Sequence, residues 1–287
     1  MKRISLVGFA VFISIFLCPD FSRAASKEEV AKHGREGVEA QRSKNWPKAI
    51  AAFRKVVELE PNAKNHNYLG VAYRESGNLD EAMKSFGAAI AADPDNAAGY
   101  VNRGTALIAQ KKYDEAINDF NEALARDDNN VIAMKFRAFA YLTKNDWQNA
   151  LQDYDAVLKQ NVGDPDARAQ RGYVQMQLKN YDKAIADYSE AIKTRPKDVS
   201  ALSMRSILYE VKGNLAKGIA DCDKILQIQP DNAEAKSRKT RLETKKSQPS
   251  PAQISPAPGQ ASPSPESSPE EEEKSSGSPK KKSKKRR

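Results

Sequence analysis

Residues 97–130 read AAGYVNRGTALIAQKKYDEAINDFNEALARDDNN, and residues 131–164 read VIAMKFRAFAYLTKNDWQNALQDYDAVLKQNVGD. When the two stretches are aligned without a gap, small residues coincide at two positions and an aromatic residue coincides at a third. The matching pairs are Gly104 with Ala138, Ala116 with Ala150, and Phe120 with Tyr154. A match at a spacing of 34 residues indicates a repeated structural unit, because no single helix or strand has so long a period.

The same alignment extends to six units that together cover residues 30–232. The units are residues 30–62, 63–96, 97–130, 131–164, 165–198 and 199–232. With positions numbered from the start of each unit, positions 8 and 20 are small in all six units, and position 24 is aromatic in five of them. Position 17 is bulky throughout, and position 32 is proline in four units. The pattern therefore recurs with the same landmarks along most of the chain.

Each unit is predicted to be a helix, a turn and a second, antiparallel helix, which makes the chain an all-α repeat solenoid. Small side chains at positions 8 and 20 let the two helices approach closely, and the larger groups at positions 17 and 24 fill the space beside that contact. Proline at position 32 cannot continue a helix and is expected to end the second one. Ser26 with Glu29 is predicted to form a capping box for the first helix. Residues 233–246 are predicted to form a polar capping helix.

These landmarks resemble those of the tetratricopeptide repeat family, whose unit also has 34 residues. The resemblance implies a right-handed superhelix in which the first helices line a concave groove that binds peptides of other proteins. In that family positions 2, 5, 9 and 12 face the peptide, and here they give an apolar centre with a polar rim. The groove candidates are Lys64, Asn67, Arg74, Ile108, Ile132, Lys135, Phe139, Leu142, Tyr173 and Met176. The alternative is that some of them belong to the core.

One ligand class of that family is not expected. Some members hold the acidic tails of heat-shock chaperones in a carboxylate clamp, which needs Lys and Asn at specific groove positions of two neighbouring repeats. In this sequence Lys64 and Asn102 stand alone at such positions. The resemblance therefore implies a peptide partner of another kind.

Positions 7 and 23 vary together along the chain. Position 7 is arginine and position 23 is aspartate in repeats three to six, whereas both are absent from repeats one and two. The pairs are Arg103 with Asp119, Arg137 with Asp153, Arg171 with Asp187, and Arg205 with Asp221. The two positions lie opposite each other in an antiparallel hairpin, so we predict a ladder of ion pairs, within repeats or between neighbours. A structural ladder is favoured over an anion-binding strip because each arginine has a matched carboxylate.

No catalytic constellation is found in the sequence, and the protein is not expected to be an enzyme. His33 and His66 share position 4 with apolar residues of other repeats, which favours a packing role. Cys222 replaces the aromatic residue at position 24 and is predicted to be a small buried group. The sequence has no Gly-rich phosphate loop and no metal-ligand spacing. We therefore expect no cofactor, no metal and no small-molecule substrate.

The first 24 residues have the parts of a secretory signal peptide. Lys2 and Arg3 precede an apolar run over residues 4–18, and small residues occupy positions 22 and 24. Cleavage after Ala24 is predicted, which exports residues 25–287 to the periplasm or the medium. Two alternatives are an uncleaved membrane anchor and a lipoprotein acylated at Cys18, although the bulky Leu17 disfavours the second.

Residues 247–287 form a tail of different composition, with eight prolines and eleven serines. Such a segment is predicted to be disordered, because it cannot bury enough apolar surface to offset its chain entropy. Its end carries a basic cluster that consists of Lys280, Lys281, Lys282, Lys284, Lys285, Arg286 and Arg287. Anionic envelope surfaces are the predicted partners of this cluster.

The distribution of charge among the leader, the repeats and the tail excludes some classes of function. The chain has a formal net charge of +9, but only +4 remains in residues 25–246 after the leader and the tail are set aside. Nucleic-acid binding by the repeats is therefore not expected, since it needs a concentrated basic face. The sequence favours an exported scaffold that binds proteins in its groove, with the tail as a second tether. The alternatives are a polyanion binder that acts through its tail and, less favoured, an unrecognised enzyme.

Overall fold

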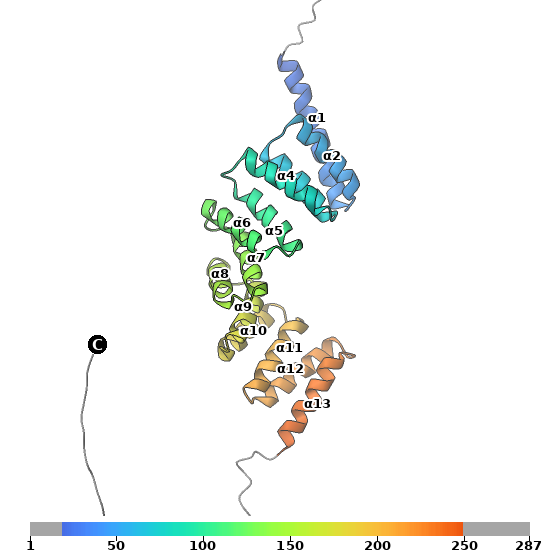
Figure 1. The fold of residues 1–287 in the computed structure, drawn as a ribbon. Coiled ribbons are helices and arrows are strands. Elements are labelled where there is room, and N and C mark those ends of the chain that lie inside the picture. Colours follow the sequence, from blue (N-terminus) through green and yellow to red (C-terminus); the bar gives the residue numbers. More distant parts are fainter. Residues whose placement is uncertain (1–18, 249–287) are drawn as a thin grey trace, which may run out of the picture. The chain divides into compact units, whose positions relative to one another are not determined.

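The computed structural model of the protein describes residues 19–248, and every regular element in that range is an α-helix (Figure 1). The chain divides into two units, Met1–Lys246 and Ser247–Arg287, of which the first contains the repeats. The helices are α1 (Pro19–Arg42), α2 (Trp46–Leu59), α3 (Ala63–Glu75), α4 (Leu79–Ala92), α5 (Ala97–Ala109), α6 (Tyr113–Arg126), α7 (Val131–Thr143), α8 (Trp147–Gln160), α9 (Pro165–Gln177), α10 (Tyr181–Thr194), α11 (Val199–Val211), α12 (Leu215–Ile228) and α13 (Ala233–Ser247). The predicted all-α repeat fold is confirmed.

Helix boundaries recur at the same repeat positions. From α3 to α12 the first helix of each repeat covers positions 1–13 and the second covers positions 17–30. Asp128 and Val162 occupy position 32 of two repeats, and the second helices of those repeats also end at position 30. The four second helices followed by proline do end before it, as predicted, but proline is not required, because the second helices of the third and fourth repeats end at the same position without it.

Asparagine or aspartate begins each first helix after α1. Its side-chain oxygen accepts a hydrogen bond from a backbone N–H of the first turn, which satisfies a donor that has no partner within the helix. The capping residues are Asn62, Asn96, Asn130, Asp164, Asp198 and, before α13, Asn232. The starts of these helices are therefore encoded one residue before each repeat begins.

The turn inside each hairpin has a fixed backbone geometry. Position 15 adopts the left-handed conformation in all six repeats, with φ between 54° at Lys44 and 85° at Gly77. Glycine occupies this position only in the second and sixth repeats, as Gly77 and Gly213. The other four repeats hold a residue with a side chain in a conformation that costs about 1–2 kcal/mol. Hairpin packing therefore overrides the local preference at those turns.

The two helices of a hairpin approach each other closely at position 8 in the first three repeats. A Cβ atom added to Gly37, Gly70 or Gly104 would lie 2.5–2.7 Å from the nearest carbon of the aromatic ring at position 24 of the same repeat. Those rings, Phe53, Phe86 and Phe120, are almost fully buried. In the sixth repeat Ser206 faces Cys222 instead, so a larger group at position 8 accompanies a smaller one at position 24. The sixth repeat thus differs from the first three at both of these positions.

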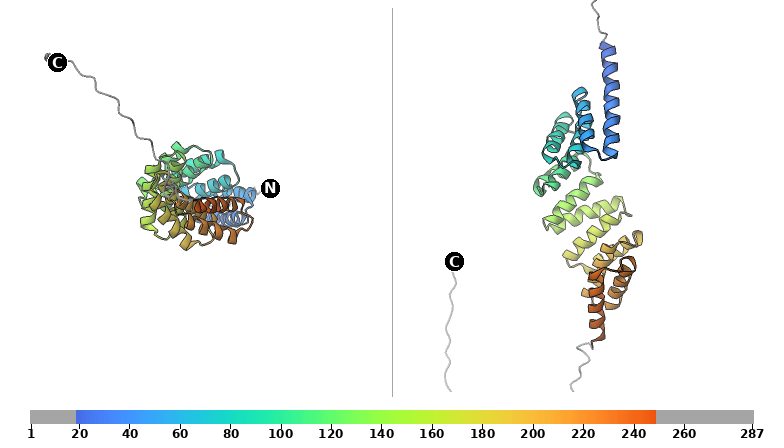
Figure 2. Two further views of the ribbon diagram at one scale, coloured as in Figure 1. Left: turned by 90° about the horizontal axis from the view of Figure 1, so that it is seen from below. Right: turned by 90° about the vertical axis from the view of Figure 1, so that its right-hand side faces the viewer.

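Successive hairpins stack on one another. The second helix of one repeat contacts the first helix of the next, and first helices of neighbouring repeats also touch, as α3 with α5 and α5 with α7. Figures 1 and 2 show the hairpins following one another in the order of the sequence. The first helices consequently form one face along the stack, which we call the groove face.

The N-terminal helix is longer than the sequence predicted. Helix α1 begins at Pro19 and extends beyond its partner α2 (Figure 2). Ser26 therefore lies inside a helix, and the predicted capping box with Glu29 at the helix start was wrong. Residues 1–18 of the predicted signal peptide lie outside the described range. No helix within residues 19–248 is long and apolar enough to cross a membrane.

Helix α13 continues the pattern of a first helix. Ala235 and Leu242 are buried against the last repeat, at the third and tenth positions of this helix. Lys239 occupies position 7, where repeats three to six carry arginine, and its Nζ lies 2.7 Å from Oδ1 of Asp223 in the preceding helix. The remaining surface of α13 is polar. The helix therefore closes the stack as half of a seventh repeat.

Candidate functional site

Each arginine at position 7 forms a bidentate ion pair with the aspartate at position 23 of its own repeat. In the fourth repeat, Nε and Nη2 of Arg137 donate to the two carboxylate oxygens of Asp153 over 2.9 and 2.6 Å. The same pair of bonds joins Arg103 to Asp119, Arg171 to Asp187, and Arg205 to Asp221. All four aspartates are buried, with side chains no more than 7% exposed. The pairing therefore ties the two helices of each hairpin together.

The third guanidinium nitrogen connects neighbouring repeats. Nη1 of the arginines at position 7 in repeats four, five and six donates to position 25 of the preceding repeat. The acceptors are Asn121, Asp155 and Ser189, at distances of 2.7, 2.7 and 2.9 Å. Arg103 has Gly87 at the corresponding place, which offers no side chain. The ladder thus runs within repeats three to six and, from the fourth repeat on, also between neighbouring repeats.

The electrostatics of the ladder favour structure over ligand binding. The hydrogen bond to aspartate raises the pKa of each of the four guanidinium groups, although burial alone would lower it. Since two or three nitrogens of every arginine are already bonded to the protein, little is left to bind an anion. In the first two repeats a different link appears, because Nε of Arg54 donates to the hydroxyl of Tyr73 over 2.7 Å.

The groove face carries an exposed apolar stripe on α7. Ile132 is 57% exposed, and Phe136 and Phe139 are each 39% exposed. These residues are four and three positions apart, so they lie on one side of the helix. The ring of Phe136 stacks on the buried ring of Phe120, with centroids 6.1 Å apart. We call Ile132, Phe136 and Phe139 the α7 stripe.

The other apolar candidates are partly buried. Ile108, Leu142 and Met176 pack against three different core clusters of the stack. Tyr173 forms an edge-on contact with Trp147, with ring centroids 6.3 Å apart. These four side chains therefore contribute to the core and also border the groove face.

The polar candidates lie mostly on the first half of the stack. Asn67 accepts a hydrogen bond from Asn102 over 3.1 Å, and Arg74 donates to Thr105 over 2.6 Å. Lys64 is exposed, with its Nζ 6.0 Å from the centre of the Tyr68 ring. Further along the stack, Lys135 is paired with Asp164 at 2.8 Å. Of these side chains, Lys64 keeps its charge available at the surface.

Burial alone would raise the pKa of Asp164, but its bonds lower that pKa overall. The carboxylate accepts hydrogen bonds from the Lys135 ammonium group and from the backbone N–H groups of Ala167 and Asp166. Asp164 therefore stays charged and holds Lys135 in place beside the α7 stripe.

A pocket of about 580 Å³ opens between α1 and α3 on the groove face. Its wall also includes the turn of the first hairpin. The charged and aromatic residues of the wall are Arg42, Lys44, Trp46, Tyr68, Arg74 and Glu75. We call this hollow the basic pocket. It combines cationic groups with two aromatic rings, so it can receive an anionic group next to an apolar one.

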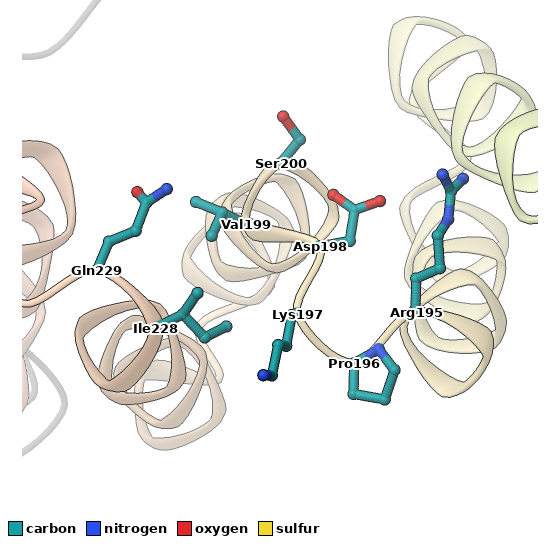
Figure 3. Close-up of a pocket in the computed structure, with 8 residues that line it drawn as sticks. All are labelled: Arg195, Pro196, Lys197, Asp198, Val199, Ser200, Ile228 and Gln229. Carbon is teal, nitrogen blue, oxygen red and sulfur yellow. The ribbon is translucent and has the colours of Figure 1, made fainter.

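A larger hollow of about 810 Å³ lies at the loop between α10 and α11, against the end of α12 (Figure 3). Two of its charged side chains make contacts within the protein. Nη2 of Arg195 donates to Asp166 over 2.5 Å, and Asp198 caps α11 by accepting from the N–H of Ala201. The close-up shows Val199 and Ile228 on one side and Pro196 on the connecting loop. This hollow lies between the α10–α11 loop, the start of α11 and the end of α12.

The histidine and cysteine side chains among the described residues do not form a reactive site with one another. His66 is partly buried, which lowers its pKa and favours the neutral ring. His33 is bonded to the carboxylate of Glu36 over 3.0 Å. Cys222 is fully buried, with its sulfur 3.3 Å from the hydroxyl of Ser206. No group of side chains suited to hold a metal ion occurs among the described residues.

Sequence reasoning missed the aromatic residues at position 6. Tyr68 and Phe136 are exposed on the groove face and stack on the buried rings of Phe53 and Phe120. Helical spacing from Ile132 and Phe139 would have placed Phe136 between them. The basic pocket was missed because its wall combines three segments of two repeats. The tail cluster from Lys280 to Arg287 lies outside the described residues.

Comparison with a family model gives a match to the description tetratricopeptide repeat. The matched segments overlap and cover residues 35–97, 69–131, 101–167, 137–198 and 169–233. A comparison with curated proteins finds no match. The family model therefore matches most of the chain and coincides with the helical hairpins.

Solved structures with the same fold share little sequence with the chain. A tetratricopeptide repeat protein from Parabacteroides merdae is 21% identical, with a TM-score of 0.61 over 76% of this chain and 87% of that one. The protein pilF of Pseudomonas aeruginosa is 18% identical, with a TM-score of 0.65 over 77% and 99%. YrrB, described as having an unusual peptide-binding site, is 23% identical, with a TM-score of 0.59 over 66% and 98%. These likenesses concern the fold.

Proposed function

The chain belongs to the tetratricopeptide repeat family, and from that premise we propose that it binds a peptide segment of a partner protein on its groove face. Membership makes it a scaffold for protein–protein interaction. The proposal specifies the surface that binds the partner and the kind of ligand that is bound. It also makes the protein a binding protein without a reaction of its own.

The α7 stripe carries this proposal. Ile132, Phe136 and Phe139 expose apolar surface on one side of α7, and half-buried Leu142 follows three residues after Phe139 on the same helix. Contiguous apolar surface with a polar rim is typical of protein-binding sites, since partner side chains that cover it leave water. A helix-lined groove of this kind binds a segment through a few anchor side chains. The peptide-binding site named for the related fold of YrrB supports the same reading.

We expect the double variant Ile132→Ser with Phe139→Ser to weaken peptide binding at least about tenfold, because burial of each side chain contributes on the order of 1 kcal/mol. The probes are peptides selected from a random display library on the unmodified full chain, and affinity is measured by fluorescence polarisation. Both side chains are exposed, so helix content should not change in circular dichroism.

The matched control is Leu59→Ser with Val162→Ser, which removes exposed apolar surface from a helix end and a loop outside the α7 stripe. This control should bind the selected peptides as the unmodified chain does. Equal losses in the two double variants, or a failure to select any peptide, would contradict the proposal.

We further propose that the protein is exported and that its tail tethers it to an anionic surface. Support comes from the sequence: a basic, apolar and small-residue leader over residues 1–24, and seven cations within the last eight residues. Near an anionic membrane each Lys or Arg contributes up to about 1 kcal/mol of attraction, which salt weakens.

Cell fractionation tests export and tethering together. The full chain is compared with a variant in which the seven cations between Lys280 and Arg287 are changed to serine. We expect both proteins outside the cytoplasm with Ala25 as the first residue by mass spectrometry. Only the unmodified chain should sediment with the envelope at low salt and be released at high salt. A chain that keeps residue 1 contradicts cleavage, and equal sedimentation of both proteins contradicts the tether.

A further inference from the structure

The basic pocket holds positive charge that the protein does not neutralise. Arg42 ends α1 and Lys44 lies in the following turn, and both side chains are exposed. Neither forms an ion pair within the part of the chain that the structure describes. Lys64 lies on the neighbouring helix with its ammonium group over the Tyr68 ring. The start of the groove face therefore presents three cations without carboxylate partners.

The cations of α5 and α7, further along the same face, are neutralised. Lys135 is bound by Asp164, and Arg103 and Arg137 are bound by the buried aspartates of their repeats. Arg74, at the edge of the basic pocket, is held by Glu75 at 3.0 Å and by Thr105. Between the basic pocket and the α7 stripe, the cations of α5 and α7 are thus paired, whereas Arg42, Lys44 and Lys64 are not, and the α7 stripe follows two repeats later.

We infer that the bound segment is an extended peptide with two unlike parts, one acidic part in the basic pocket and one apolar part on the α7 stripe. This inference rests on the proposed function and specifies its ligand. Charge complementarity assigns the acidic part, because carboxylates can pair with Arg42 and Lys44 at a partly desolvated site. Trp46 and Tyr68 in the pocket wall contact the apolar carbon atoms of side chains in the same peptide.

The distance between the two subsites limits the length of the peptide. Neighbouring packed helices lie about 8–10 Å apart, and α3 and α7 are separated by α5. The span is therefore about 20 Å, which an extended chain covers with about six residues at roughly 3.3 Å each. A peptide of about 10–12 residues can reach both subsites at once, because it supplies the residues that cross the span and a few more that bind at each end.

A peptide fits the face better than a nucleic acid. A polyanion of uniform charge needs cations along its whole path. The charged side chains of α5 and α7 on this face are already paired, and the exposed residues of α7 are apolar. The observations therefore favour a ligand whose charge is confined to one end.

The test is a selection of random peptides, about 16 residues long so that they can span the two subsites. The bait is the full chain with its seven tail cations changed to serine, which removes the competing basic cluster. We expect the selected peptides to hold a block of Asp and Glu and, several residues away, a block of aromatic or branched apolar residues. The charge reversal Arg42→Glu with Lys44→Glu should weaken the binding of these peptides at least about tenfold. A new selection on this variant should yield peptides without acidic blocks.

The control reversal Lys48→Glu with Lys224→Glu changes the net charge equally on exposed positions of α2 and α12. It should leave affinity and selected sequences unchanged. Selected peptides without an acidic block, or equal weakening by both reversals, would overturn the inference while leaving groove binding intact. A failure to select any peptide would overturn the proposed function as well. Stronger competition by single-stranded DNA than by the selected peptides would assign the basic pocket to nucleic acid instead.

Discussion

Asp153→Ala is expected to lower the free energy of unfolding by about 3 kcal/mol, because it leaves the Arg137 guanidinium without its carboxylate in a largely buried place. Both oxygens of Asp153 accept hydrogen bonds from Arg137, and the aspartate side chain is only 5% exposed. The arginine side chain is 23% exposed and keeps its bond to Asn121, so the cost should lie at the lower end for broken buried pairs. Urea denaturation followed by circular dichroism measures the effect.

Two comparisons identify the cause of that loss. Asp155→Ala removes a carboxylate from the same helix, but Asp155 is 53% exposed, so the change should cost less than about 1 kcal/mol. Changing Arg137→Met together with Asp153→Ala removes both charges and should recover part of the stability lost in the single variant. If Asp153→Ala and Asp155→Ala cost the same, the buried ion pair does not stabilise the hairpin as the structure indicates.

The ladder shows why the sequence predicted these contacts so well. Arg137 and Asp153 are 16 residues apart, and the same spacing recurs in four repeats. Because both residues of a pair are present together or absent together in each repeat, their contact can be predicted without knowledge of the rest of the structure. The inter-repeat bonds to Asn121 and Ser189 were not predicted, because position 25 has no constant residue and is Arg, Gly, Asn, Asp, Ser and Asp in the six repeats.

The groove face was predicted less completely for a physical reason. Ile132 and Phe139 were named from their repeat positions, whereas Phe136 was not, although it lies between them on the same helix. Whether Ile108 or Met176 is exposed depends on the side chains of the next repeat and not on its own position. The start of α1 at Pro19 likewise lies before the repeat pattern, where no landmark indicates where the helix begins.

Gly70→Ala is expected to lower the free energy of unfolding by about 2 kcal/mol, the range typical of an overpacked core. The added Cβ would lie 2.5 Å from Cε1 and 2.6 Å from Cδ1 of Phe86. The Phe86 ring is fully buried between α3 and α4, so relief requires the two helices to separate or the ring to leave its preferred conformation. Alanine is a better helix former than glycine, so helix propensity alone would predict a gain in stability. The expected loss is therefore opposite in sign to that preference.

Gly87→Ala, in the same repeat, supplies the decisive comparison. Gly87 lies within α4, and a Cβ added there meets no atom within 4 Å. Alanine should therefore raise stability by about 0.5–1 kcal/mol, since it restricts the unfolded chain and favours the helix. The same chemical change thus has opposite effects at two positions of one hairpin, and urea denaturation midpoints should differ in sign. If both variants were stabilised, the contact between position 8 and the aromatic ring would not limit how closely the helices of this repeat approach.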